Sequence, residues 1–184
     1  MKKKGFIGLG VMGYPMAGHL ASNSFDVCVF NRTQGKALKW KNEFTGTLCS
    51  SPQEIAVQSD VIMICVGNDD DVRDIICGND GMLEFLNPGT IIIDHTTTSA
   101  TLANEMDQIL QGKGCYFLDA PISGGQAGAE AGKLSVMVGG CKESFKAVKK
   151  ILDAYSKFSK HMGNSGSGQL TKMVNQICIG GLLQ

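Results

Sequence analysis

The feature that most restricts the fold of this chain is a regular alternation of short apolar runs with longer amphipathic segments. The apolar runs are mostly unbroken, as expected for strands that are buried on both faces of a parallel sheet. They occupy residues 5–9, 25–30, 60–66, 90–94, 116–120 and 134–139. The segments with helical periodicity cover residues 11–22, 34–44, 52–58, 70–77, 99–112, 143–155 and 168–183. This alternation predicts an α/β fold with a Rossmann-like, doubly wound and mostly parallel sheet.

Charge and hydropathy exclude several classes of protein. Seventeen Lys plus Arg residues balance seventeen Asp plus Glu residues, so the formal net charge is zero. A surface for nucleic acid or anionic membrane would need a clustered positive field, which this balance argues against. The apolar run 61–66 is far too short to span a membrane. Glycines and a proline interrupt the apolar stretch after the basic N-terminus, which argues against a secretory signal. We therefore expect a cytoplasmic protein.

The seven cysteines have no spacing typical of a metal site or a disulfide framework. The sequence contains no C-x-x-C pair, and several thiols fall within apolar runs, as Cys28 and Cys65 do. Reduced cysteines in such positions behave as small apolar side chains. We therefore expect buried, reduced thiols and no metal site.

Three glycines with the spacing G-x-G-x-x-G follow the first apolar run directly: Gly8, Gly10 and Gly13. In a dinucleotide site the first glycine allows a tight turn, the second lets the backbone approach the pyrophosphate, and the third lets the helix pack closely on the strand. Backbone N–H groups at the start of the following helix would then hold the pyrophosphate. The predicted cofactor-binding turn comprises Gly8, Leu9, Gly10, Val11, Met12 and Gly13.

The end of the second predicted strand indicates which dinucleotide binds. An NAD site usually has an acidic residue there, which accepts hydrogen bonds from the ribose hydroxyls. This chain has Asn31, Arg32 and Thr33 instead. A guanidinium suits a 2′-phosphate, because it can make two parallel hydrogen bonds to it. We therefore predict that NADP(H) is preferred and NAD(H) is possible, the alternative being that Arg32 is a solvated turn residue.

Three segments of the chain resemble the β-hydroxyacid dehydrogenase family. They are GFIGLGVMGYPMAGHL at 5–20, DAPISGGQAGAEAGKLSVMVGG at 119–140, and GSGQLTKMVNQ at 166–176. That family includes 3-hydroxyisobutyrate dehydrogenases, tartronate semialdehyde reductases and glyoxylate/succinic semialdehyde reductases. The resemblance covers essentially the whole chain, with the three motifs in the expected order.

The resemblance implies a substrate site and a catalytic residue. Ser123, Gly124 and Gly125 would hold the substrate carboxylate, and a hydroxyl beside backbone N–H groups suits an anion. Lys172 would be the catalytic residue with Asn175 as its neighbour, since residues three apart share one face of a helix. A lysine whose pKa is lowered to about 7–8 can take or return the proton of the substrate hydroxyl. Burial and a nearby helix N-terminus would both lower it.

The resemblance also implies further contacts to the cofactor. Val66, Gly67 and Asn68 match family positions in the loop after a strand, and Thr97 matches a position near the nicotinamide. Asp94 and His95 are expected to serve the structure of their turn, and no proton-transfer role is predicted for His95 or His161. Ligands bind beyond the carboxyl ends of strands in such sheets, which is where these residues lie.

Several functions remain open at this stage. The related 6-phosphogluconate dehydrogenases carry a K-x-x-x-H-N pattern, whereas Lys172 is followed by MVNQ here, so that substrate is disfavoured. An oxidoreductase that transfers a hydride between NADP(H) and a small 3-hydroxy acid or semialdehyde fits the residues best. The alternatives are an NAD-dependent 3-hydroxyisobutyrate dehydrogenase and a non-catalytic dinucleotide-binding or assembly module.

The resemblance further implies that the chain consists of two parts. Residues 1–163 would form the NADP-binding domain, and residues 164–184 would begin a long interdomain helix. In the family an all-helical second domain follows, closes over the substrate and forms the subunit interface. We therefore expect a truncated chain, the alternative being a short natural protein that recruits the missing helices from a partner. The chain as it stands is expected to bind cofactor with little turnover, and the full-length protein to be a homo-oligomer. The apolar side chains expected to be exposed are Ile177, Ile179, Leu182 and Leu183.

Overall fold

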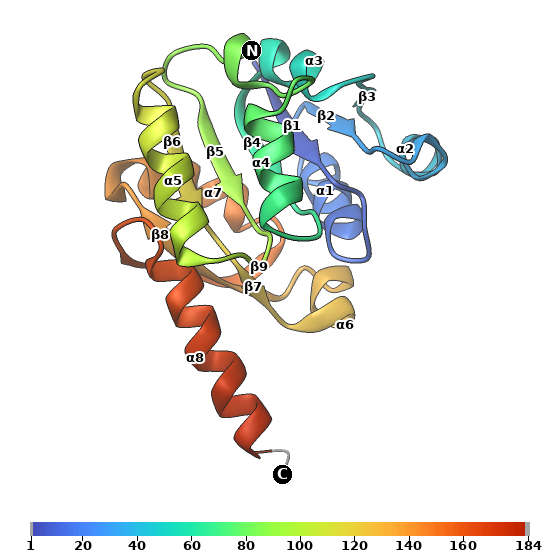
Figure 1. Cartoon of the computed structure of the whole chain (residues 1–184). Helices are drawn as coiled ribbons and strands as arrows, with labels where there is room; N and C mark the ends of the chain where they lie inside the picture. The colour runs from blue at the N-terminus through green and yellow to red at the C-terminus, as the bar shows by residue number, and fades with distance from the viewer. Residues whose placement is uncertain (1, 183–184) are drawn as a thin grey trace.

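A parallel sheet with the strand order β3-β2-β1-β4-β5-β6 forms the centre of the fold (Figure 1). The computed structural model describes residues 2–182, so Leu183 and Gln184 lie outside the described residues. The six strands are β1 (Lys3–Ile7), β2 (Val27–Phe30), β3 (Thr47–Leu48), β4 (Ser59–Ile64), β5 (Ile91–Asp94) and β6 (Tyr116–Asp119). This order is that of the Rossmann fold, which confirms the predicted fold class.

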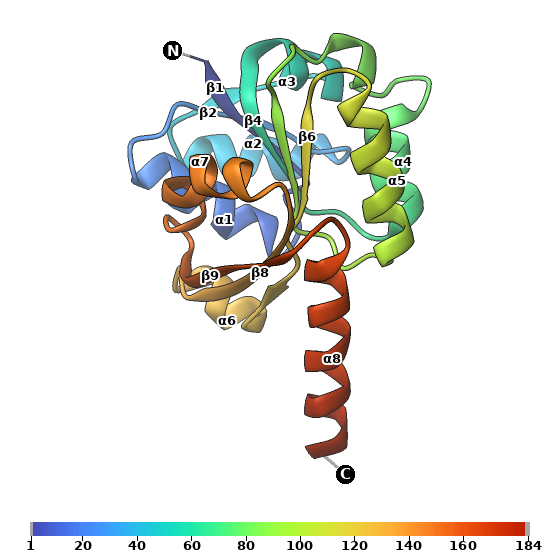
Figure 2. The ribbon, with the colours of Figure 1, turned by 90° about the vertical axis from the view of Figure 1, so that its left-hand side faces the viewer.

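Helices cover both faces of this sheet. One layer contains α1 (Gly13–Ser22), α2 (Gln34–Glu43) and α7 (Lys142–Leu152), and the other contains α3 (Pro52–Gln58), α4 (Asp69–Cys77) and α5 (Ala100–Gln111). Figure 2 shows α1 and α7 on one side of the strands and α4 and α5 on the other. A short 3₁₀ helix, η1 (Leu83–Phe85), precedes β5.

The unbroken apolar runs are explained by burial on both faces of the central strands. On β4, Val61 and Met63 belong to the core beneath α1, α2 and α7. The intervening Ile62 and Ile64 belong to the core beneath α3, α4 and α5. Successive side chains of a strand point to opposite faces, so a strand covered on both sides needs apolar residues at every position.

A second group of strands extends the sheet beyond β6. β8 (Leu134–Gly140) runs antiparallel to β6 and to the short β7 (Ile122–Ser123), and parallel to β9 (Ser156–Gly163). Only the last residues of β6 pair with the end of β8, so this group lies mainly past the carboxyl end of β6. The short helix α6 (Gly125–Glu130) connects β7 with β8.

The sequence did not predict β3, β7, β9 or α6. β9 has no apolar run that a sequence analysis could detect. Its buried residues Ser156 and Ser159 are polar, whereas its apolar Phe158 is 52% exposed. The predicted helix 143–155 ends at Leu152, and β9 begins four residues later. α6 is rich in Gly and Ala and buries only Ala129, which leaves no helical apolar stripe for a sequence analysis to detect.

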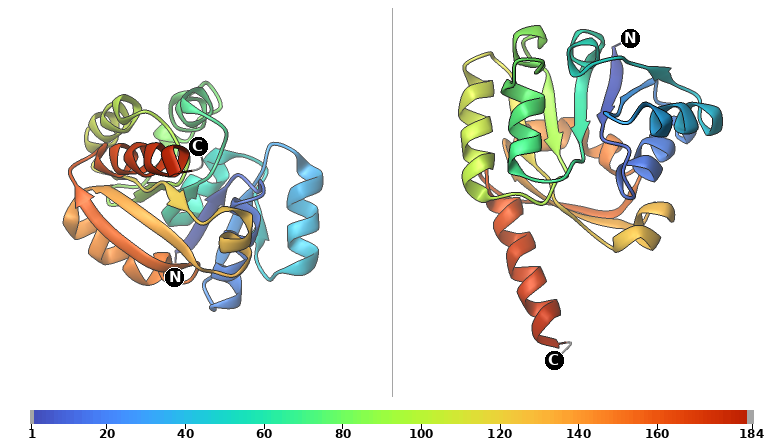
Figure 3. Two further views of the ribbon diagram at one scale, coloured as in Figure 1. Left: turned by 90° about the horizontal axis from the view of Figure 1, so that it is seen from below. Right: turned by 45° about the vertical axis from the view of Figure 1, so that its right-hand side comes forward.

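The last helix, α8 (Ser167–Leu182), extends away from the body of the molecule (Figures 2 and 3). It carries a group of exposed apolar side chains: Leu170, Met173, Val174, Ile177 and Ile179. The expected exposure of Ile177 and Ile179 is therefore confirmed, whereas the side chains of Leu182 and Leu183 lie outside the described part. None of the helices within residues 2–182 has the length and apolarity that a bilayer span requires.

All the cysteines are free thiols, as expected, but they are not all buried. Cys28, Cys49 and Cys115 are buried, whereas Cys77 and Cys178 are exposed. The expectation of buried thiols therefore holds for the first three residues and is wrong for Cys77 on α4 and Cys178 on α8, while Cys65 and Cys141, at the ends of β4 and β8, are partly exposed.

Candidate cofactor and active site

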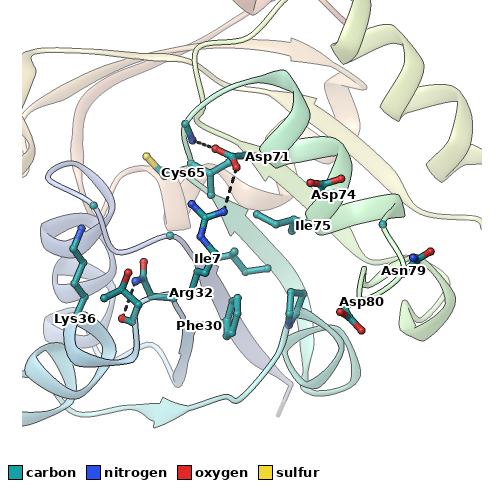
Figure 4. Close-up of a pocket in the computed structure, with 18 residues that line it drawn as sticks. Ile7, Phe30, Arg32, Lys36, Cys65, Asp71, Asp74, Ile75, Asn79 and Asp80 are labelled. Atoms are coloured by element: carbon teal, nitrogen blue, oxygen red, sulfur yellow. Dashed lines mark hydrogen bonds and ion pairs between the residues drawn. The ribbon is translucent and has the colours of Figure 1, made fainter.

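Two cavities meet at the carboxyl ends of the strands. One, of about 770 Å³, is lined by the ends of β1 and β2 and by α4; we call it the β2 cavity (Figure 4). The other, of about 640 Å³, is lined by residues 95–97, residues 122–125 and α8; we call it the α8 cavity. Both include Cys65, Val66 and Gly67 in their walls, so the two cavities lie side by side, and we call the pair the groove. Such a groove is where α/β sheets of this kind bind ligands.

The glycine-rich turn between β1 and α1 has the geometry predicted for it. Gly8 has φ +96°, and a Cβ there would lie 2.2 Å from the carbonyl oxygen of Cys65. A Cβ on Gly13 would lie 2.0 Å from the carbonyl oxygen of Gly8, so the start of α1 closely approaches the turn. A Cβ on Gly10 would meet nothing within 4 Å, and Gly10 lines the β2 cavity. The backbone at Gly10 is thus open to a ligand.

Asn31, at the end of β2, joins two segments of the protein. Its Oδ1 accepts the N–H of Leu9 at 2.8 Å, and its Nδ2 donates to the carbonyl oxygen of Thr33 at 2.9 Å. The next residue, Arg32, has a side chain that is 90% exposed, with Nη1 3.6 Å from Oδ1 of Asp71 on α4. Asn31, Arg32 and Thr33 all line the β2 cavity.

The loop after β4 is tied to both ends of the groove. The N–H of Val66 donates to Oγ1 of Thr96 at 3.1 Å, and the N–H of Gly67 donates to Oδ2 of Asp71 at 3.2 Å. Asn68 lines neither cavity; it caps α4, its Oδ1 accepting the N–H of Asp71 at 2.9 Å.

The other predicted cofactor contacts are divided among three places. Met12 and Thr97 line the α8 cavity. Leu9 and Val11 line neither cavity of the groove and face a separate hollow between α1 and α2. Gly13 lies behind the turn. The predicted cofactor contacts therefore line the groove except Leu9, Val11, Gly13 and Asn68.

Lys172 on α8 faces the predicted substrate-binding residues. The α8 cavity brings Lys172 together with Ser123, Gly124 and Gly125. Only 8% of Lys172 is exposed, and this burial lowers the pKa of its ammonium group, because removal from water disfavours the charged form. The predicted neighbour Asn175 does not line the cavity, and its buried Nδ2 has no hydrogen-bond partner among the described residues. Gln176, which the sequence analysis missed, does line it.

Asp119, at the end of β6, fixes the start of α8. Its Oδ1 accepts the N–H of Gly166 at 2.8 Å and its Oδ2 accepts the N–H of Gln169 at 2.9 Å. The Gln169 side chain donates to the carbonyl oxygen of Thr96 at 2.8 Å and accepts the N–H of Thr98 at 3.1 Å. Burial raises the pKa of Asp119, while these backbone N–H groups act in the opposite direction. The sequence analysis gave Asp119 and Gln169 no role, because their partners are distant in sequence.

His95 lies in the wall of the α8 cavity and supports it internally. Its Nδ1 lies 2.7 Å from the carbonyl oxygen of Ala120, so Nδ1 donates, and Nε2, 2.8 Å from Oη of Tyr155, accepts. Burial lowers the pKa of His95 to about 4, which keeps the imidazole neutral. Both nitrogens are therefore occupied by the protein, in agreement with the expected structural role. His161 likewise contacts the backbone, with Nε2 2.8 Å from the carbonyl oxygen of Gly140.

The Rossmann strand order and the open glycine turn beside the β2 cavity are the features of a dinucleotide-binding domain. Residues 3–174 match the family model described as the NAD binding domain of 6-phosphogluconate dehydrogenase, and the chain belongs to this family. Within it, the chain resembles oxidoreductases of the β-hydroxyacid dehydrogenase type, which confirms the resemblance found in the sequence.

Similar proteins are known from several organisms. An uncharacterized oxidoreductase of Shewanella frigidimarina (strain NCIMB 400) is 49% identical over 184 residues, which are 100% of this chain and 63% of the relative. The Mycobacterium tuberculosis 3-hydroxyisobutyrate dehydrogenase structure with L-serine matches with a TM-score of 0.90 and 31% identity, over 97% of this chain and 60% of that one.

A third similar protein is Psf3 in complex with NADP+ and 2-OPP. It matches with a TM-score of 0.90 and 26% identity, over 95% of this chain and 62% of that one. The chain therefore spans less than two thirds of the length of each of these three relatives.

Replacing Asp119 by Asn tests the attachment of α8. An amide has one acceptor oxygen, so its NH₂ group would face one of the two backbone N–H donors. We expect the free energy of unfolding to fall by about 2–3 kcal/mol in denaturant titrations followed by circular dichroism. The control is Asp153→Asn, whose exposed carboxylate pairs with Lys149 and whose loss should cost less than about 1 kcal/mol. Equal stability of Asp119→Asn and wild type would contradict this role.

Replacing His95 by Gln tests the neutral buried imidazole. In the unfolded chain a histidine takes up a proton below its usual pKa of about 6.5, whereas folded His95 resists protonation down to about pH 4. Its contribution to wild-type stability is therefore complete above pH 6.5 and falls by about 2 kcal/mol on acidification to pH 5. Wild type should exceed His95→Gln in free energy of unfolding at pH 7.5, and this excess should be smaller by about 2 kcal/mol at pH 5.

The control for this experiment is Tyr155→Phe, which removes the hydroxyl partner but retains the imidazole. This variant should keep the acid-dependent loss of stability that His95→Gln no longer shows. Parallel pH profiles for wild type and His95→Gln would show that His95 does not titrate as inferred.

Proposed function

We propose that the chain is the cofactor-binding part of an oxidoreductase that transfers a hydride between NADP(H) and a small 3-hydroxy acid or semialdehyde. The position of Lys172 carries this proposal. Its side chain is nearly buried in the wall of the same cavity as Ser123, and that cavity adjoins the one lined by Arg32. With the roles proposed here, a proton-transfer group, an anion site and a phosphate site would line these two adjoining cavities.

The residues present suit a dinucleotide. The open backbone at Gly10, beside the N-terminus of α1, leaves room for a pyrophosphate. Arg32, Thr33 and Lys36 line the β2 cavity and would hold the adenosine end with its 2′-phosphate. The α8 cavity, with Thr97 in its wall, would hold the nicotinamide end. When bound, the nicotinamide supplies the hydride acceptor or donor. The binding of NADP+ by Psf3 supports this assignment.

Lys172 would transfer the proton that accompanies the hydride. In oxidation its neutral amine takes the proton of the substrate hydroxyl, and in reduction its ammonium group returns one. The lowered pKa favours this role, because burial makes the neutral amine more accessible than it is for a lysine in water. Ser123 and the N–H groups of Gly124 and Gly125 would hold the substrate carboxylate. Asn175 does not line the α8 cavity, so its buried Nδ2, unpaired within residues 2–182, would need a side-chain rotation to donate to the substrate oxygen.

An NAD-dependent 3-hydroxyisobutyrate dehydrogenase is the second candidate. The ion pair between Arg32 and Asp71 favours it, because a guanidinium engaged by a carboxylate is less available to a 2′-phosphate. The M. tuberculosis relative is a 3-hydroxyisobutyrate dehydrogenase with L-serine, itself a 3-hydroxy acid. A substrate panel with NADPH and NADH separates the two candidates from each other and from a non-catalytic binding module.

The organisation of the whole protein also belongs to this proposal. We place the boundary between the NADP-binding domain and the interdomain helix at residues 163/164, next to the end of β9 at Gly163. The exposed apolar side chains of α8 support a further domain that packs on this helix, and homo-oligomers formed through that domain. The substrate itself would be a small molecule with a carboxylate.

Replacing Lys172 by Ala tests the proton-transfer role. NADPH oxidation with glyoxylate or succinic semialdehyde, measured on the full-length gene product, should fall by about 10²–10⁴-fold. The dissociation constant for NADPH should change less than about twofold, because Lys172 lies on the substrate side of the groove. Lys157→Ala, at an exposed lysine of β9, is the matched control and should retain activity. Full activity of Lys172→Ala would exclude the proposed role.

A further inference from the structure

The carboxylate of Asp71 lies in the wall of the β2 cavity and holds two groups there. Its Oδ1 lies 3.6 Å from Nη1 of Arg32, and its Oδ2 accepts the N–H of Gly67 at 3.2 Å. Figure 4 shows the Arg32 guanidinium reaching towards Asp71. The residue proposed to contact a 2′-phosphate is thus engaged by a carboxylate of the protein.

Asp71 differs in its contacts from the two acidic residues that precede it. The Asp69 carboxylate accepts hydrogen bonds from the backbone N–H and the hydroxyl of Ser99. The Asp70 carboxylate is 89% exposed and lies 3.0 Å from Nη1 of Arg73. All three residues belong to the first turn of α4, where a negative charge interacts favourably with the helix dipole. Asp71 is the member of this turn that faces Arg32.

The other charged residues of the β2 cavity leave the Arg32–Asp71 ion pair in place. Lys36 is a second cation in its wall, and Asp74 and Asp80 are further carboxylates. In Figure 4 the side chains of Asp74 and Asp80 lie on the opposite side of Arg32 from Lys36. The salt bridge of Arg32 among the described residues is with Asp71. A 2′-phosphate would therefore have to compete with Asp71 for the guanidinium, whereas a ribose 2′-hydroxyl would not.

We propose that Asp71 is a specificity-determining residue that reduces the preference for NADP(H) over NAD(H) by holding Arg32. This inference rests on the proposed 2′-phosphate contact of Arg32. The expected effect is modest, because the side chains of Arg32 and Asp71 are 90% and 31% exposed and solvent screens the pair. Exposed ion pairs of this kind correspond to about a two- to fivefold change in an equilibrium constant.

The test is calorimetric titration of the chain with NADP+ and with NAD+. Asp71→Asn removes the charge but retains an oxygen that can accept the N–H of Gly67. The ratio of the NAD+ to the NADP+ dissociation constant should rise about two- to fivefold, mainly through tighter NADP+ binding. Asp70→Asn is the matched control, since it removes the same charge from the same helical turn and should leave the ratio within about twofold. An unchanged or lower ratio in Asp71→Asn would overturn the inference.

Arg32→Ala separates this inference from the proposed function. If Arg32 binds the 2′-phosphate, this variant should lower the ratio about tenfold or more. In the Arg32→Ala background the further change Asp71→Asn should then have less than about a twofold effect, because there is no guanidinium to release. An effect as large as in wild type would refute action through Arg32. An unchanged ratio in Arg32→Ala alone would reject the proposed phosphate contact itself, and this inference with it.

Discussion

The carboxylate of Asp119 accepts two N–H groups at the start of α8, and the position of Lys172 depends on this contact. The segments around this carboxylate are packed so closely that two neighbouring positions have no space for a side chain. A Cβ on Gly168 would lie 2.5 Å from the carbonyl oxygen of Asp119, and one on Gly139 would lie 2.3 Å from Oδ1 of Asp119. Glycines on β8 and α8 thus allow three segments to converge on one buried carboxylate. Through Gln169 the same helix turn also holds the backbone at Thr96 and Thr98.

Much of the fold could be predicted because its signals are local. The central strands are continuous in sequence and apolar at every position, as Val61, Ile62 and Met63 are, since helices cover both faces of the sheet. The turn between β1 and α1 was predictable for a similar reason. Gly8 and Gly13 are needed because nearby backbone leaves no space for a side chain. Steric requirements of this kind are visible in the spacing of residue types.

The contacts that complete the site could not be predicted in the same way. Arg32 was singled out from its place after β2, but its partner Asp71 lies on another helix, and the spacing of the two residues carries no signal. Asp119 could have been noticed as a charged residue at the end of a buried strand. Its partners lie 47 and 50 residues further along the chain. β9 was missed because its buried residues, Ser156 and Ser159, are polar.

The loop Cys65–Gly67 is a wall shared by the two cavities, and its backbone is bonded on both sides. Val66 donates to Thr96 beside the α8 cavity, while Gly67 donates to the same carboxylate that holds Arg32. In the proposed function, recognition of the adenosine phosphate and shaping of the substrate pocket would therefore share a few backbone atoms. For protein engineering, the two halves of the groove are not separable modules. A substitution of Asp71 made to change cofactor choice would also alter a support of the loop that borders the proposed substrate pocket.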